Sequence, residues 1–171
     1  TYQNPPSLQP NTYMMIHFQD YVDPQGELKW LFRKEACMHC TDAACVTVCP
    51  SGALYYNKEF KTVGLNHEKC IGCKECVAAC PFEVPRYDAK TDKVYKCDMC
   101  ESRISNGLEP ACVKACPTGA LKWGDKEAIL GAAGKRKGDL GTLASTYGDK
   151  FVGGTHVIYV LQFKPEVYDV L

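Results

Sequence analysis

Twelve cysteines gathered into one stretch of the chain constrain its fold more than any other feature of the sequence. All of them lie between Cys37 and Cys116, so both ends of the 171-residue chain contain none. Disulfide scaffolds tend to distribute their cross-links through the fold, because closing long loops stabilises most. Clustering at spacings of two and three residues instead indicates that the cysteines bind metal.

The cysteines form three groups, and each group ends in a Cys-Pro pair. The groups read Cys37-x2-Cys40-x4-Cys45-x3-Cys49-Pro50, Cys70-x2-Cys73-x2-Cys76-x3-Cys80-Pro81 and Cys97-x2-Cys100-x11-Cys112-x3-Cys116-Pro117. The second group matches the bacterial ferredoxin run C-x2-C-x2-C-x3-C-P at every position, and the other two lengthen its middle. The sequence therefore predicts a protein that binds several [4Fe-4S] clusters and transfers electrons.

The spacing also predicts which cysteines share a cluster. Three closely spaced thiolates reach three irons of one cube, whereas the fourth cysteine points away and ligates the cube of a partner motif. Residues 53–66 are typical of a β-hairpin, and two cysteine motifs around a hairpin make one two-cluster ferredoxin module. We therefore expect cluster A to be bound by Cys37, Cys40, Cys45 and Cys80, and cluster B by Cys70, Cys73, Cys76 and Cys49. The alternative is that each group binds its own cube in sequence order.

The third group has no partner motif in the sequence. Cys97, Cys100 and Cys112 can hold three corners of a cluster C, while Cys116 should point at a cluster D. Under the crossing rule, the other ligands of both clusters would come from a further cysteine motif upstream of Thr1. The alternative is that twelve cysteines make three complete cubes, with Cys116 closing the third.

Other chemistries explain the sequence less well. Zinc ribbons contain C-x2-C pairs, but four cysteines as dense as those of the second group are hard to wrap around one ion. Disulfides at this density would be strained. No nucleotide-binding or hydrolase motif is present, so we expect no catalysis by this chain alone. A formal net charge of zero provides no basic field for nucleic acid, and no apolar stretch is long enough to span a bilayer.

Several residues near the cysteines receive structural interpretations. We expect His39, inside the first motif, to hydrogen-bond or pack beside a cluster, and Trp30 and Trp123 to lie in the core or in an interface. Basic residues beside the ligands could offset the charge of reduced clusters, but most are expected to be solvated; they are Lys69, Lys74, Lys96, Arg103 and Lys114.

The whole pattern predicts an α+β fold of tandem bacterial-type ferredoxin-like modules, with small hairpins, short helices and long loops. The remaining elements expected are an extended arm at 1–12, strands at 13–18 and 28–32 around a turn at 22–27, a short helix at 126–133, a mobile loop at 131–141 and a strand at 155–163. The expected divisions are an N-terminal arm and hairpin at 1–36, belonging to a second module, a ferredoxin-like module at 37–92, the last cysteine motif at 93–122 and a C-terminal extension at 123–171.

Four longer stretches carry a family resemblance. They are LKWLFRKEACMHC (28–40), CIGCKECVAACPFEVPR (70–86), KVYKCDMCESRISNGLEPACVKACPTGA (93–120) and GGTHVIYVL (153–161). Together with QNPP (Gln3–Pro6), they resemble the iron-sulfur (beta) subunit of formate dehydrogenase, one of the four-cluster subunits of molybdopterin oxidoreductases. In that family the first motif pairs with the fourth and the second with the third; the present sequence holds motifs two to four.

The resemblance implies a role and partners. The chain would relay single electrons from a large catalytic subunit with a molybdenum or tungsten pterin to a membrane cytochrome b or a soluble acceptor. It implies a periplasmic location, and a cytoplasmic one is the alternative. Two other functions remain open: the equivalent subunit of a nitrate, sulfoxide or polysulfide reductase, and a free-standing polyferredoxin.

Overall fold

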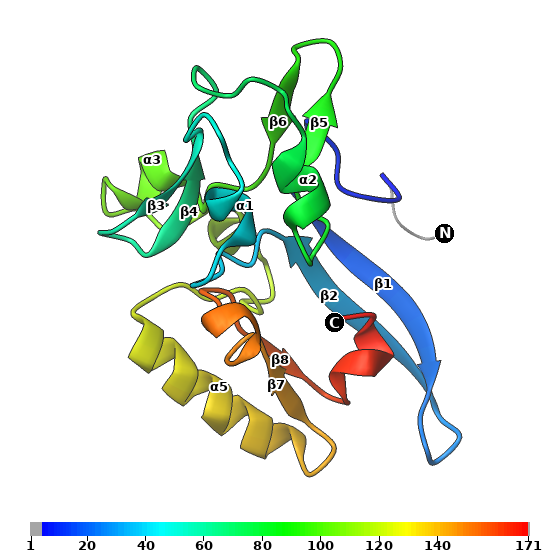
Figure 1. Ribbon diagram of the computed structural model, residues 1–171. Helices are drawn as coiled ribbons and strands as arrows, with labels where there is room; N and C mark the ends of the chain where they lie inside the picture. The colour runs from blue at the N-terminus through cyan, green and yellow to red at the C-terminus, as the bar shows by residue number, and fades with distance from the viewer. Residues whose placement is uncertain (1–4, 171) are drawn as a thin grey trace.

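Two-stranded hairpins and single-turn helices are the recurring elements of this chain. The computed structural model describes residues 5–170 and contains, within them, four antiparallel sheets of two strands each (Figure 1). A two-stranded sheet is marginally stable alone, so each pair depends on what packs against it. The mixture of hairpins and short helices confirms the expected α+β class.

The first hairpin pairs β1 (Met14–Val22) with β2 (Leu28–Ala36). A buried carboxylate fixes its turn, because Asp23 Oδ1 accepts the backbone N–H groups of Gln25 at 3.0 Å and Glu27 at 2.8 Å. These two bonds occupy donors that the sharp turn removes from the strand ladder. The turn was predicted, and both strands run further than the sequence suggested.

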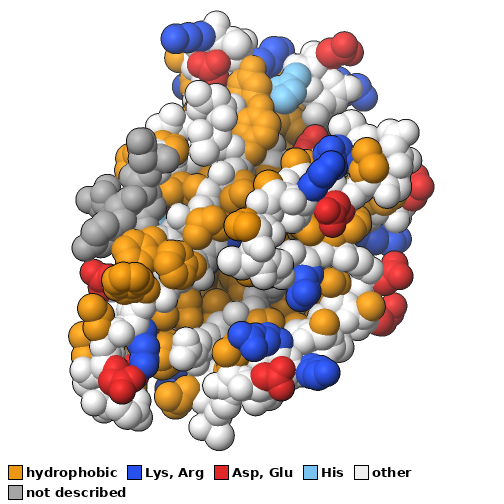
Figure 2. All heavy atoms as spheres, turned by 180° about the vertical axis from the view of Figure 1, so that it is seen from behind, with side chains coloured by type: hydrophobic (Ala, Val, Ile, Leu, Met, Phe, Trp, Pro, Cys, Tyr) orange, Lys and Arg blue, Asp and Glu red, His pale blue; other side chains and the backbone are white. Residues whose placement is uncertain are grey.

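One face of this hairpin carries exposed hydrophobic side chains. They gather over β1 and β2 on the side of the molecule seen in Figure 2, and include Ile16, Val22, Leu28 and Phe32. Trp30 lies on the same face and is 67% exposed, so it does not belong to the core, and its place in an interface stays a prediction. The opposite face packs against the C-terminal part of the chain through Leu31.

The second hairpin lies inside the cysteine-rich region, as predicted for residues 53–66. It pairs β3 (Leu54–Asn57) with β4 (Thr62–Leu65), and packs beside α1 (Ala44–Thr47), which in turn contacts α2 (Glu75–Ala79). Cysteines form part of the core at this point. The buried members of that core are Ala43, Ala53, Leu54, Val63, Cys70, Cys76 and Val94.

Three further short elements complete this region. After the second cysteine group the chain forms a third hairpin from β5 (Arg86–Asp88) and β6 (Lys93–Tyr95). The third cysteine group carries α3 (Glu101–Ile104) and α4 (Ala111–Lys114). Helices of one turn are unstable in isolation, so these segments depend on their tertiary contacts.

A single helix, α5 (Lys126–Leu140), replaces the short helix and mobile loop expected at 126–141. The loop prediction was wrong because it weighted three glycines over the alanines, lysines and arginine between them, which have high helix propensity. Gly131, Gly134 and Gly138 sit in the helix, and Gly141, at φ +95°, ends it. The helix lies beside the last strands of the chain (Figure 1).

The C-terminal segment forms β7 (Ser145–Tyr147), η1 (Phe151–Gly153), β8 (Tyr159–Leu161) and η2 (Pro165–Tyr168). The expected strand at 155–163 is confirmed only over β8, because loop hydrogen bonds occupy its first residues. A second core forms where this segment meets the first hairpin. Its buried members are Leu31, Met38, Tyr147, Leu161, Phe163 and Tyr168.

The N-terminal arm is partly anchored. Residues 1–4, which include Gln3 and Asn4 of QNPP, lie outside the described residues. Leu8 is buried in a small cluster with Met15, Cys37 and Val84. Arg86 Nε also donates to the Leu8 carbonyl at 2.8 Å. Within residues 5–170, no helix is long and apolar enough to cross a membrane.

We predict that Gly134→Ala stabilises the protein by about 0.5–1 kcal/mol, because glycine costs this much inside a helix and the added Cβ would meet nothing within 4 Å. The measurement is the midpoint of urea unfolding under anaerobic conditions. Gly141→Ala is the control and should destabilise, because its φ of +95° disfavours any residue with a Cβ. A midpoint that falls for Gly134→Ala would contradict a continuous helix.

Candidate metal centres

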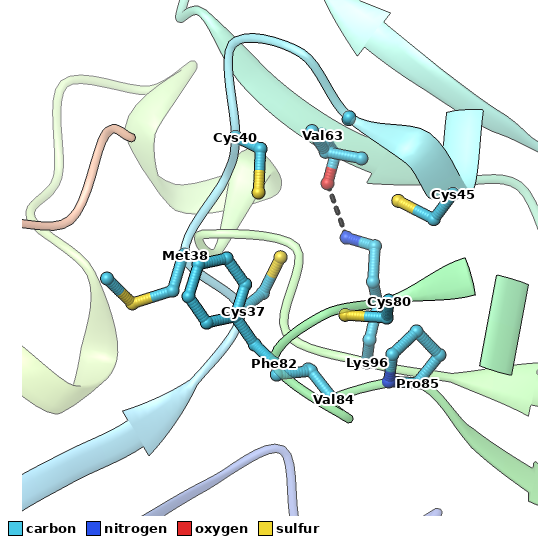
Figure 3. A pocket seen from close by; sticks show the side chains of 11 residues that line it. Cys37, Met38, Cys40, Cys45, Val63, Cys80, Phe82, Val84, Pro85 and Lys96 are labelled. Carbon is cyan, nitrogen blue, oxygen red and sulfur yellow. Dashed lines mark hydrogen bonds between the residues drawn. The ribbon is translucent and has the colours of Figure 1, made fainter. Parts of the chain in front are cut away.

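Four cysteines line one hollow between the end of β2, helix α1 and the segment that follows α2 (Figure 3). They come from two groups, with Cys37, Cys40 and Cys45 from the first and Cys80 from the second. The other lining residues are Met38, Ala43, Val63, Phe82, Val84, Pro85 and Lys96. Four thiols facing one largely apolar space are the donor set that a [4Fe-4S] cube uses, so the residues present fit such a group.

Burial changes the acidity of these thiols. Desolvation, followed by the proximity of Cys37 and Cys80, raises the pKa of Cys40 to about 12. Burial likewise raises the pKa of Cys45 to about 12, with Cys37 as the neighbouring thiol that adds most to the effect. Thiolates are the metal-binding form, so binding at this hollow must release protons and supply compensating positive charge.

The second set of cysteines is also brought together. Burial raises the pKa of Cys76 to about 11, and the nearby Cys73, Cys49 and Cys70 raise it further. Cys49 belongs to the first group in sequence, while the other three belong to the second. Cys49 of the first group and Cys76 of the second also pack in the same core.

The third group divides into a trio and a separate cysteine. Burial raises the pKa of Cys112, Lys34 opposes this, and the thiols of Cys97 and Cys100 add to it, so these three lie near one another. Cys116 is different, because the Thr118 hydroxyl and nearby backbone N–H groups lower its pKa to about 7.

The three C-x2-C loops share one backbone feature. The residue before the second cysteine has positive φ in all three, with +49° at His39, +69° at Gly72 and +62° at Met99. This conformation turns backbone N–H groups back toward the first sulfur: His39 donates to Cys37 Sγ and Met99 to Cys97 Sγ, both at 3.4 Å. Such N–H groups stabilise negative charge on ligand sulfur.

The repeated sequence after Cys49 and Cys116 has a shared physical role. Burial raises the pKa of Cys49, but backbone N–H groups at Leu54 and Ala53 and the Ser51 hydroxyl outweigh it and lower the pKa. Cys116 is surrounded in the same way by Thr118, Ala120 and Leu121. The repeat C-P-S/T-G-A-L thus builds one hydrogen-bonding cradle twice.

Two polar side chains near the hollow are fully enclosed. His39 is 0% exposed, and its Nδ1 accepts the Val63 N–H at 3.0 Å; burial lowers the pKa of this imidazole. Lys96 is 5% exposed and donates to the carbonyls of Val63 at 2.5 Å and Cys97 at 2.9 Å. We expected most of the basic residues beside the cysteines to be solvated, but Lys96 is buried. The sequence shows only that Lys96 directly precedes Cys97, and this position does not predict that its side chain is buried.

Sequence reasoning also missed the role of the C-terminal segment. Its backbone anchors the first cysteine loop, because Thr41 N–H donates to the Gly154 carbonyl and Asp42 N–H to the Val152 carbonyl, both at 2.9 Å. The backbone N–H of His156 donates to the His39 carbonyl at 3.1 Å. The stretch GGTHV carries part of the family resemblance, and these contacts give it a physical reason.

The arrangement of the ligands distinguishes a site for a single metal ion from a site for a cluster. Within residues 5–170, no three His, Cys, Asp or Glu side chains are placed to share one ion. A cube takes one thiolate on each iron, so its ligands do not converge on a single atom. All twelve cysteines, which lie in the described part, are free thiols.

Comparison with known proteins gives consistent matches. The family model described as 4Fe-4S dicluster domain matches residues 28–126. The formate dehydrogenase iron-sulfur subunit of Haemophilus influenzae is 42% identical over 98% of this chain and 55% of its own length. The nitrate-inducible subunit of Escherichia coli is 42% identical over 98% of this chain and 58% of its own. The chain thus spans little more than half the length of these two relatives.

A third relative is covered more completely. The formate dehydrogenase 2 subunit beta (cytochrome c-553) of Nitratidesulfovibrio vulgaris is 36% identical over 98% of this chain and 80% of its own length. The match therefore extends beyond the cysteine motifs, to the first hairpin and the C-terminal segment that anchors the first cysteine loop.

We predict that Gly72→Ala lowers the urea midpoint of the cluster-loaded protein. Its φ of +69° costs an L-residue about 1–2 kcal/mol, and its Cβ would lie 2.6 Å from the Asp92 carbonyl oxygen. Gly26→Ala is the matched control, with φ +82° and nothing within 4 Å of the added atom. Equal losses in both variants would show that the loop can move away from Asp92.

Proposed function

The chain belongs to the 4Fe-4S dicluster domain family and is related over nearly its whole length to iron-sulfur subunits of formate dehydrogenases, and from this premise we propose that it is the electron-transfer subunit of such an enzyme. It relays single electrons through [4Fe-4S] clusters between a catalytic subunit and an acceptor. The observation that carries this proposal is the hollow enclosed by four thiols from two sequence groups. It supplies the ligands for a redox centre.

We assign the ligands crosswise. Cluster A is bound by Cys37, Cys40, Cys45 and Cys80, which share the hollow of Figure 3. Cluster B is bound by Cys49, Cys70, Cys73 and Cys76, and the mutual effect of these thiols on the Cys76 pKa supports it. Cys97, Cys100 and Cys112 hold three corners of cluster C. Cys116 ligates a fourth centre, cluster D, whose other ligands lie outside the three motifs.

The protein's own residues provide what electron transfer needs. When bound, each cube accepts and releases one electron at a time. Cysteine thiolates fix the centres in place, and the N–H groups at His39 and Met99 favour the added negative charge. The apolar lining around the first hollow limits water and thus keeps the electrostatic effect of each donor strong.

The modules, partners and location follow from the same proposal. Residues 37–92 form one two-cluster module, residues 93–122 and the arm and hairpin at 1–36 belong to a second, and 123–171 extend it. The catalytic partner is a large subunit with a molybdenum or tungsten pterin that oxidises formate. The acceptor is a membrane cytochrome b or a soluble carrier, in keeping with a relative named for cytochrome c-553. The periplasm is the proposed compartment.

A second candidate function rests on another relative. A subunit of the anaerobic dimethyl sulfoxide reductase of Haemophilus influenzae is 48% identical, but over only 50% of this chain. Formate dehydrogenase relatives match 98% of it. The wider coverage favours formate dehydrogenase over a subunit of another molybdopterin oxidoreductase.

Paired substitutions test the crosswise ligands. Cys37→Ala combined with Cys80→Ala should lose about four irons, no more than either single variant, because both cysteines serve cluster A. Cys37→Ala combined with Cys49→Ala should lose about eight, because it damages clusters A and B. The measurement is iron and labile sulfide per purified protein. Sequence-order ligation predicts the reverse pattern for the two pairs.

Co-purification from the native host tests the functional proposal. A tagged copy of the chain should retain a pterin-containing large subunit, and anaerobic formate should generate EPR signals of reduced clusters in that complex. Sulfoxide or nitrate added to the pre-reduced complex is the control and should leave these signals unchanged. A cluster-loaded monomer with no large partner would instead support a free-standing polyferredoxin.

A further inference from the structure

One residue, His39, contacts sulfurs from two different cysteine groups, one through its backbone and one through its ring. His39 lies in the first C-x2-C loop, where its backbone N–H donates to Cys37 Sγ at 3.4 Å. Its Nε2 lies 3.8 Å from Cys97 Sγ, in the third group. The sequence separates these sulfurs widely, and this single residue contacts both.

The tautomer of His39 follows from its other partner. Nδ1 accepts the Val63 N–H at 3.0 Å, so Nδ1 carries no proton. A neutral imidazole then has its proton on Nε2, which points at Cys97 Sγ. The contact with Cys97 is therefore an N–H···S hydrogen bond donated by the ring.

His156 holds the backbone of His39 in place. The His39 carbonyl accepts both the backbone N–H of His156 at 3.1 Å and the His156 Nδ1–H at 2.8 Å. His39 itself has φ +49°, and its side chain is fully buried. Few orientations of the ring are compatible with these contacts.

We propose that His39 is a positioning residue that links clusters A and C and raises the reduction potential of C by donating its Nε2–H to the Cys97 thiolate. This inference rests on the ligand assignment proposed above. Reduction adds negative charge to a cluster and its sulfurs, and a hydrogen-bond donor stabilises that charge. Loss of the donor therefore makes the affected centre harder to reduce.

Lys96 is the alternative source of such an effect, and its geometry differs. Its ammonium donates to the carbonyl oxygens of Val63 and Cys97, and it also lines the first hollow. Its charge acts through space on both centres. His39 acts on cluster C through one ligand sulfur. The two effects can therefore be distinguished by whether the reduction potential changes at one centre or at both.

Two substitutions of His39 each keep one of the two hydrogen bonds of its ring. His39→Asn places an amide oxygen near the Nδ1 position to accept the Val63 N–H, tolerates positive φ, and is too short to reach Cys97. His39→Gln restores a donor near the Nε2 position. His67→Gln is the control, because His67 Nε2 contacts the Val94 carbonyl at 3.1 Å and no sulfur.

Anaerobic redox titration followed by EPR is the measurement. His39→Asn should lower the potential of one centre, with the reduced-to-oxidised ratio falling about tenfold at fixed potential, or about 59 mV for one electron. His39→Gln should return toward the wild-type value, and His67→Gln should leave all potentials unchanged. Unchanged potentials in His39→Asn with full iron content would overturn the inference, as would equal shifts in every centre.

A spectroscopic measurement on the unsubstituted protein keeps the test independent of folding. Protein labelled with ¹⁵N only in its histidine imidazole rings should show, by pulsed EPR, coupling of one ring nitrogen to one reduced centre, and His39→Gln should abolish it. Absence of any histidine coupling overturns the inference and leaves the electron-transfer proposal intact. A wild-type protein that binds no clusters would instead overturn that proposal.

Discussion

The folding of this chain depends on the thiols that surround a common hollow, because they lie close together and are shielded from water. The pKa of Cys40 and of Cys45 stands at about 12 because each thiol is desolvated beside other cysteines. Positive charge that enters the hollow favours the joint ionisation of these sulfurs. The apolar core around them is small and itself includes Cys70 and Cys76. Folding of this region and occupancy of its metal centres are therefore one equilibrium.

The edge of β4 shows how the polypeptide prepares for that occupancy. A two-stranded sheet leaves one edge of each strand without a partner, and a buried edge must find hydrogen bonds elsewhere. At Val63 the N–H is taken by the His39 ring and the C=O by the Lys96 ammonium. His39 belongs to the first cysteine group and Lys96 precedes Cys97, so one strand residue ties two groups to the same hairpin.

Local sequence patterns predicted the elements that are formed by residues close together in the chain. The hairpin at 53–66 and the turn at 22–27 follow from short-range turn and strand patterns, and both are confirmed. The continuous helix α5 was missed because the glycines inside it outweighed their helix-forming neighbours in the interpretation. Burial of Lys96 and the hydrogen bond that holds Thr41 to Gly154 arise from contacts between distant segments. No local pattern encodes such contacts, which is why they could not be predicted.

The three Cys-Pro cysteines share a design that is independent of which cube they serve. Backbone N–H groups at the second and fourth positions after each cysteine act on its sulfur: Phe82 and Val84 for Cys80, Thr118 and Ala120 for Cys116. Cys80 lies in the same hollow as the first group, whereas Cys116 has the cradle but not the shared hollow. Because the cradle stabilises a thiolate before any metal is present, Cys116 is locally prepared to act as a ligand. Its proposed role in a separate centre rests on the crossing rule, and the cradle, repeated in sequence after Cys49, explains only its readiness to bind.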